Sequence, residues 1–211
     1  MNKVILLTLA FFFLLMSCDP QTDTMAMEAE IPVTTSAAAD TTQSKHLIQF
    51  NENLPTVGIL MYDGVLTTEV TAAAEVFTKP NGEGGEQLFN VVTIAETTEP
   101  ILTEENLRMV PDYTFTNAPQ LTVMFVPSAY DMHTITRNEA IVNFIKTRDK
   151  ETKYTVSNCG GAQLIGASGI AKGKKIVTWI GGGEQLQKDY PELLVQDDSK
   201  VTFIRDGKYF S

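Results

Sequence analysis

The sequence predicts a doubly wound α/β domain with a mostly parallel sheet and helices on both faces. From residue 56 onward, short and almost continuously apolar β-rich runs alternate with segments of helical periodicity. Strands that are apolar on both faces are typical of parallel sheets covered by helices. In addition, 43% of the 211 residues are hydrophobic, which is enough for one domain with a sizeable core.

The first elements are a strand, a helix and a second strand. Residues 56–61 (TVGILM) predict a buried strand that ends in the turn sequence YDG. Residues 68–77 predict a helix, because apolar side chains recur there at helical spacing. These side chains are Val70, Ala73 and Val76 or Phe77. The β-rich run 89–95 (FNVVTIA) predicts the second strand.

The middle of the chain is expected to leave the sheet and to return to it. Residues 101–115 have the pattern of a hairpin excursion, and 121–127 (LTVMFVP) that of another buried strand. A helix is predicted over 138–146, where Ala140, Ile141, Phe144 and Ile145 lie at helical spacing.

The remaining elements follow in the same alternation. We expect a strand over 153–157 (KYTVS), a helix over 161–168, and further strands over 175–178 and 201–204. Ligand sites in such sheets lie at the carboxyl ends of the strands. Residues that directly follow a predicted strand are therefore the first candidates for chemistry.

The first 53 residues do not have the pattern of a folded domain. Residues 1–17 carry one lysine and then a short apolar stretch, which indicates a secretory signal peptide because a membrane span needs about 20 apolar residues. The sequence LMSC, ending at Cys18, resembles a bacterial lipobox and implies a lipidated Cys18 at the mature N-terminus. An ordinary signal peptide with a chance cysteine is the alternative.

Residues 19–45 are rich in Thr, Ala, Asp and Gln and have almost no large apolar side chains, and we assign the whole stretch 18–53 to one connecting segment. Such a segment predicts a flexible tether. The folded domain is therefore expected over 54–211, in a protein held at a membrane of the bacterial cell envelope, on its periplasmic or extracellular face.

The charge and the few metal-binding residues exclude several classes of partner. The chain has 16 Lys and Arg against 26 Asp and Glu, a net charge of -10, which argues against binding to nucleic acid phosphates. Two cysteines and two histidines supply neither a disulfide framework nor a zinc site. We therefore expect no metal and no cofactor.

The segment 154–162 (YTVSNCGGA) has the layout of a nucleophile elbow. A strand runs into a helix through Cys159, and the residues two positions away on either side, Ser157 and Gly161, are small enough for the tight turn. The thiol would lie at a helix N-terminus, which favours the thiolate. The alternative is a buried, inert cysteine in a glycine-rich turn.

The sequence around this elbow, VSNCGGAQLIGASGIAKGKKIVTW, resembles the ThiJ/PfpI superfamily of the class I glutamine amidotransferase-like fold. This resemblance implies a flavodoxin-like three-layer sandwich. Upstream, VGILMYDGV and TEVTAAAEVF, and near the end FIRDGKY, resemble the subgroup with isonitrile hydratase and the AraC-type amidase-like domains. The similarity covers about residues 55–211.

The resemblance implies a carboxylate and a set of backbone donors beside Cys159. Glu69 would approach the sulfur and share a proton with it, whereas a solvated Glu69 that stabilises its own helix is the alternative. The N–H group of Gly160 would stabilise developing negative charge. Ser128 and Ala129 replace the Gly-Gly of many relatives, so their backbone donors remain but with a changed orientation.

The place where many relatives carry a histidine is occupied by Trp179 in this sequence. The loss of a Cys–His pair argues against amidase or peptidase chemistry, which needs a base to protonate the leaving amine. Trp179 is then expected to be a pocket wall or a core residue. His133 is a candidate alternative base in the loop after 121–127, or else an exposed loop residue.

Two functions remain open for this domain. The first is an enzyme in which Cys159 is the nucleophile and Glu69 the acid or base, acting on a small electrophile such as an isonitrile or a reactive aldehyde. The second is a non-enzymatic envelope domain that binds a small ligand or senses oxidation through Cys159. Relatives are often dimers, so the resemblance allows a homodimer. Relatives also continue past 208–211 with a final helix, so we expect either an incomplete sequence or uncovered apolar sheet surface.

Overall fold

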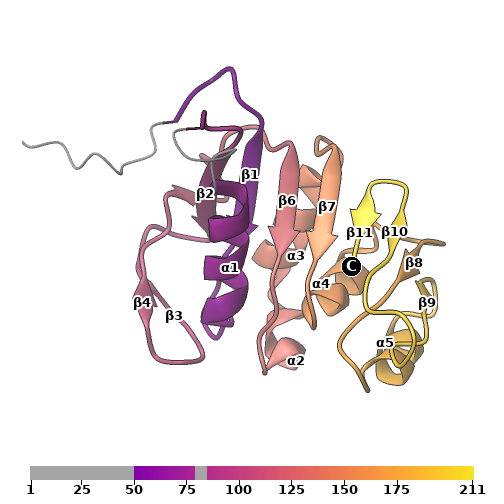
Figure 1. Ribbon diagram of the computed structural model, residues 1–211. Helices are drawn as coiled ribbons and strands as arrows, with labels where there is room; N and C mark the ends of the chain where they lie inside the picture. The colour runs from indigo at the N-terminus through magenta and orange to yellow at the C-terminus, as the bar shows by residue number, and fades with distance from the viewer. Residues whose placement is uncertain (1–49, 79–84) are drawn as a thin grey trace, which may run out of the picture. The chain divides into compact units, whose positions relative to one another are not determined.

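The computed structural model describes residues 50–78 and 85–211. Seven strands form its central sheet (Figure 1). In spatial order they are β10 (Arg205–Asp206), β11 (Tyr209–Phe210), β7 (Tyr154–Ser157), β6 (Val123–Val126), β1 (Thr56–Leu60), β2 (Asn90–Ala95) and β5 (Tyr113–Thr114). All neighbouring strands are parallel except β10 and β11. The predicted doubly wound, mostly parallel α/β fold is thereby confirmed.

Two short sheets lie beside the central one. Strands β3 (Ile101–Leu102) and β4 (Arg108–Met109) form an antiparallel hairpin, and β8 (Lys175–Ile176) pairs in parallel with β9 (Leu194–Val195). The hairpin was predicted within residues 101–115. The end of that segment, β5, instead joins the central sheet beside β2.

Helices lie on both faces of the central sheet. Figure 1 shows α1 (Thr67–Thr78) on the near face, whereas α3 (Glu139–Arg148) and α4 (Gly161–Ser168) lie behind the strands. Two short helices, α2 (Met132–Ile135) and α5 (Gly183–Asp189), were not predicted from the sequence. None of the helices in the described residues is long and apolar enough to cross a bilayer.

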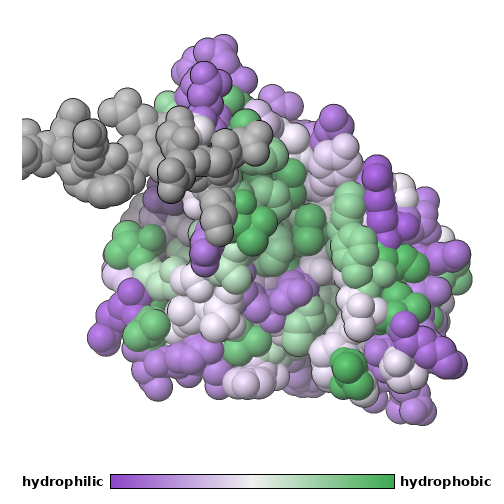
Figure 2. All heavy atoms as spheres, viewed as in Figure 1, coloured by the Kyte–Doolittle hydropathy of each residue, from purple (hydrophilic) through white to green (hydrophobic). Residues whose placement is uncertain are grey.

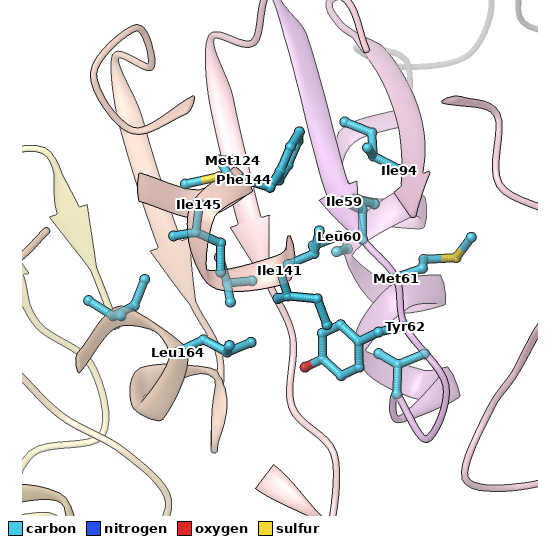
Figure 3. Packing of buried hydrophobic residues seen from close by; sticks show 14 of the residues in the cluster. Ile59, Leu60, Met61, Tyr62, Ile94, Met124, Ile141, Phe144, Ile145 and Leu164 are labelled. Atoms are coloured by element: carbon cyan, nitrogen blue, oxygen red, sulfur yellow. The ribbon is translucent and has the colours of Figure 1, made fainter. Parts of the chain in front are cut away.

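The core between the sheet and α3 is built from the apolar residues that the helical spacing identified. Ile141, Phe144 and Ile145 are buried and face Met124 of β6 (Figure 3). The helix begins after Asn138, whose side chain accepts hydrogen bonds from the first free N–H groups of α3. This core fixes β6 and β7 side by side, so that their carboxyl ends can present one site.

The core on the side of α1 differs from the prediction at one residue. Val70 and Ala73 are buried against the sheet, and Phe77 is half-buried with its ring against Phe89. Val76, however, is 69% exposed. Helical spacing alone allowed either Val76 or Phe77, and the larger aromatic ring takes the inner position.

Part of the near face of the sheet has no helix over it in the described residues. The register aligns Phe125, Val156 and Phe210 on this face, and all three are half-buried. Figure 2 shows apolar side chains at the surface to the right of α1, as expected for an incompletely covered sheet face.

The strand predicted over 201–204 is wrong. Phe203 is 64% exposed, and the chain enters a sheet later, at β10. The reason lies in the turn: Gly207, with φ of 66°, reverses the chain between β10 and β11 and so sets where the two strands pair. The predicted signal peptide, Cys18 and most of the tether lie outside the described residues.

Candidate functional site

Cys159 occupies a strained turn between β7 and α4. Its φ of 51° lies in the left-handed region, which a non-glycine residue adopts at an energetic cost. Gly161 makes this turn feasible, because a Cβ at that position would lie 2.2 Å from the carbonyl oxygen of Val126. The thiol-bearing residue itself is partly exposed. The turn therefore has the geometry of the predicted nucleophile elbow.

Glu69 reaches this elbow from the first turn of α1. Its Oε2 accepts a hydrogen bond of 2.6 Å from the N–H of Ser128, and the side chains of Asn158 and Cys159 lie close enough to its carboxyl group to influence its pKa. Burial raises the pKa of Glu69, and the three neighbours Ser128, Asn158 and Cys159 offset part of the rise. The predicted pair of Cys159 and Glu69 thus lies together in the structure.

One peptide group links Glu69 to a tyrosine at the end of β1. The hydroxyl of Tyr62 donates to the carbonyl oxygen of Pro127 at 2.6 Å, and the next N–H, of Ser128, is the one that Glu69 accepts. Burial raises the pKa of Tyr62, and the nearby Glu69 and Cys159 act in the same direction. The hydroxyl therefore remains protonated and keeps this peptide plane in place.

The three backbone donors expected to stabilise negative charge all have partners. The N–H of Gly160 donates to Ser128 Oγ at 3.0 Å, the N–H of Ser128 to Glu69, and the N–H of Ala129 to Met132 Sδ at 3.2 Å. Gly160, Ser128 and Ala129 do lie around Cys159, as expected. Their N–H groups, however, are not free to meet an oxyanion.

A cavity of about 550 Å³ opens beside Cys159. Its walls combine the elbow, the loop after β6 and the segment before α5. The lining residues are Leu66, Ser128, Ala129, Tyr130, Asp131, Met132, His133, Cys159, Gly160, Gln163, Trp179, Gln185 and Asp189. Glu69 is not among them, so this carboxylate would exchange protons with a ligand through or around the sulfur of Cys159.

Both additional pocket candidates line the cavity. Trp179 is 38% exposed and rests on Gly182, where a Cβ would lie 2.4 Å from the indole ring. The exposed His133 belongs to the short helix α2. Within residues 50–78 and 85–211, no hydrogen bond joins its ring to Cys159, whereas Glu69 lies beside the thiol.

Three residues of the site were not identified from the sequence. Tyr62 binds the peptide group between Pro127 and Ser128 that Glu69 also binds, and Asn158 lies beside the Glu69 carboxyl group. The hydroxyl of Thr178 donates to the carbonyl oxygen of Cys159 at 2.8 Å. Tyr62 and Asn158 directly follow the strands predicted over 56–61 and 153–157, and that position was the available signal. Across the described ranges, no group of three or more His, Cys, Asp or Glu side chains could hold a metal ion.

Comparisons with known proteins show which family and which fold this chain resembles. The model of the DJ-1/PfpI family matches residues 55–209. Isonitrile hydratase of Pseudomonas putida is 29% identical over 113 residues, which cover 53% of this chain and 47% of that protein. The alignment therefore spans about half the length of this relative.

Two crystal structures resemble the fold at low sequence identity. A ThiJ/PfpI family protein from Pseudomonas syringae has a TM-score of 0.64 at 21% identity, over 79% of this chain and 69% of that one. Drosophila melanogaster DJ-1beta has a TM-score of 0.62 at 15% identity, over 74% of this chain and 80% of that one. At these identities the likeness concerns the fold alone.

Proposed function

Because the chain belongs to the DJ-1/PfpI family, we propose that it is a cysteine-dependent enzyme that adds water to a small electrophilic carbon, with an isonitrile as its substrate. The observation that carries this proposal is the pairing of Cys159 with a carboxyl group of raised pKa, at a site whose backbone donors are already engaged. The partial likeness to an isonitrile hydratase supports the choice of substrate.

In the first step, the sulfur of Cys159 attacks the terminal carbon of the isonitrile. A C–S bond forms, and the electron pair that remains on carbon takes up a proton. Glu69 is placed to supply this proton, because it contacts the sulfur and its raised pKa increases the share of the protonated acid near neutral pH. The product of this step is a thioimidate bound to Cys159.

In the second step, water adds to the thioimidate carbon, with Glu69 as the base that takes one proton. The two protons of the water end on the nitrogen and on the sulfur. The C–S bond breaks with its electron pair going to sulfur, and the oxygen forms the carbonyl group of the product. The sum of both steps converts an isonitrile and one water into an N-substituted formamide. Cys159 and Glu69 return to their starting states.

The engaged N–H groups favour this reaction over acyl transfer. Attack on an ester or amide places negative charge on a carbonyl oxygen, which needs free donors aimed at it. Attack on an aldehyde has the same requirement. The isonitrile carbon instead receives its proton directly, so no oxyanion forms in the first step. For the same reason, hydration of an isonitrile suits the site better than chemistry on a glyoxal or another aldehyde.

The direct test is conversion of a small alkyl isonitrile to its formamide by the purified chain, followed by NMR. We expect Cys159→Ala to abolish turnover, because the nucleophile is lost. Glu75→Gln is the matched control, since Glu75 lies exposed on the same helix as Glu69, and it should retain wild-type turnover. If the wild type and Cys159→Ala produce formamide equally, the proposal is wrong. Isonitrile binding without any turnover would favour a ligand-binding domain.

We also propose that the mature protein is lipidated at Cys18 and tethered to the bacterial envelope by the segment 18–53. The lipobox-like sequence before Cys18 supports this placement. Metabolic labelling with a palmitate analogue should mark the wild type and not Cys18→Ala.

A homodimer is part of the same proposal, and sedimentation of the purified chain at several concentrations tests it.

A further inference from the structure

Ser128 occupies the space beside the N–H group that follows the nucleophile. Its Oγ accepts the hydrogen bond of Gly160 at 3.0 Å, and its own proton is directed to the carbonyl oxygen of Ala129, 3.2 Å away. Ser128 is only 2% exposed. The contact is close, because a Cβ on Gly160 would lie 2.4 Å from this hydroxyl.

The two groups also lie at the cavity. Both Ser128 and Gly160 belong to its lining, together with Cys159. Removal of the hydroxyl would therefore leave the N–H of Gly160 directed into space that is continuous with the cavity. A second donor lies next to it, the N–H of Ala129, which is held only by the weak sulfur acceptor of Met132.

We propose that Ser128 is a specificity-determining residue whose hydroxyl caps the Gly160 amide and thereby selects against acyl transfer at Cys159. The inference rests on the proposed use of Cys159 as a nucleophile and names the substrates that the site refuses, namely esters, thioesters and amides. A bulky neighbour would exclude such substrates by shape. Ser128 excludes them by occupying the donor that their transition states require.

The refused reaction can be measured with an activated ester. With p-nitrophenyl acetate, Cys159 Sγ forms a bond to the carbonyl carbon, and the bond from that carbon to the p-nitrophenolate oxygen breaks. The leaving p-nitrophenolate takes the electron pair, and a thioester remains. The transition state carries negative charge on the carbonyl oxygen. Alkylation by iodoacetamide, in contrast, forms an S–C bond and releases iodide without any oxyanion.

The experiment compares these two reactions at Cys159 in the full-length chain. Mass spectrometry of the peptide that contains Cys159 gives both rates, and their ratio removes any change in the nucleophilicity of the thiol. Ser128→Ala should raise the ratio of acylation to alkylation about ten-fold or more, since one oxyanion donor is worth about 10²–10³ in rate. Ser128→Gly should do the same and serves as the second variant if Ser128→Ala misfolds.

The matched control is Ser168→Ala. Ser168 is also buried, lies on α4, and donates to the carbonyl oxygen of Ile165 away from the site, so its ratio should equal that of the wild type. A ratio within about two-fold of the wild type in the folded Ser128 variants would overturn the inference. The outcome is independent of isonitrile turnover: a failure to hydrate isonitriles refutes the proposed function, whereas an unchanged ratio refutes only the role of Ser128.

Discussion

Glu69 and Asp149 are two enclosed carboxylates at opposite ends of the strands β6 and β7, and their partners differ. Asp149, which is 7% exposed, has Lys208 Nζ 3.0 Å from its Oδ2 and accepts the hydroxyl of Thr155 at 2.7 Å. Glu69 has only neutral donors, and in the described part of the chain no cationic side chain lies within 4.0 Å of it.

This difference indicates a structural role for Asp149 and suits Glu69 to proton transfer. Lys208 compensates the charge of Asp149 and, with the hydroxyl of Tyr209 3.0 Å away, ties β11 to the start of β7. Glu69 lacks such compensation, so burial raises its pKa. A carboxyl group in that state can give and take a proton, whereas a paired carboxylate is better suited to holding strands together.

The largest expected effect is on turnover, which should depend on Glu69 and not on Asp149. Glu69→Gln should lower kcat for isonitrile hydration by about 10²–10⁴-fold, because the amide cannot carry the proton. Asp149→Asn should change kcat by less than about three-fold per folded molecule. The measurement is steady-state formamide production, normalised to folded protein by circular dichroism. Equal losses in the two variants would remove the distinction between the carboxylates.

The second effect concerns stability, where the order reverses. Asp149→Ala should lower the free energy of unfolding by about 3 kcal/mol, because it removes the carboxylate that Lys208, Thr155 and Tyr209 share and leaves Lys208 and Tyr209 only carbonyl acceptors. The figure is at the low end for a buried pair, since the Lys208 side chain is 28% exposed. Urea denaturation checks this value. Lys150 is exposed and adjacent in sequence to Asp149, so Lys150→Ala should change the free energy of unfolding by less than about 0.5 kcal/mol.

Removal of the cation alone should have a smaller effect. Lys208→Met keeps the apolar stem but leaves Asp149 without its counter-charge, and we expect a loss of about 1 to 2 kcal/mol in the same denaturation assay. Lys174→Met is the control, because Lys174 lies 3.5 Å from Asp206 in a more exposed pair, and exposed pairs contribute little to stability. A loss no larger than the control's would show that Lys208 does not hold Asp149.

The smallest effect is a dependence of stability on pH that comes from Glu69. Its pKa in the folded protein is raised above the ordinary value of 4.5. As the pH rises past that value, the unfolded chain releases the proton first, so the wild type loses stability until the pH passes the raised folded pKa. Glu69→Gln has no such loss.

Thermal unfolding of the wild type and Glu69→Gln between pH 4 and pH 8 tests this sign. The two melting temperatures should converge near pH 4, and the variant should melt a few degrees higher near pH 8. A wild type that gains stability relative to Glu69→Gln as the pH rises would show that the folded protein favours the ionised Glu69.

The comparison also shows what the sequence could reveal. The strands β1, β2, β6 and β7 and the helices α1, α3 and α4 were predictable, because each is a long enough apolar run or an amphipathic repeat. The strand predicted over 175–178 is present as β8 (Lys175–Ile176), two residues shorter than expected. The two-residue strands β9 to β11 were not predictable in the same way, since turns and tertiary contacts set where such short strands pair. Asp149 illustrates the limit: its partner Lys208 is distant in sequence, and no local pattern connects the two.

The candidate site was predictable in its residues and not in its hydrogen bonds. The small residues around Cys159 indicate a tight turn, and the resemblance to the family led to Glu69. The state of the Gly160 amide depends on the rotamer of Ser128, thirty-two positions earlier, and no periodicity reports a side-chain rotamer. The same is true of the peptide group between Tyr62 and Glu69, which exists only once β1 and β6 are paired.

The left-handed backbone conformation of Cys159 lowers the stability of the fold, whereas the thiol at that position is needed for the proposed catalysis. A side chain in this conformation costs about 1 kcal/mol or more relative to glycine. Replacement of Cys159 by glycine would therefore remove the backbone strain at this turn. Among random variants selected only for resistance to heat, Cys159→Gly would therefore be a favoured survivor, and it would lack the thiol. Laboratory evolution of a more robust version of this protein would need a selection for activity in every round, because stability alone drives the sequence away from its nucleophile.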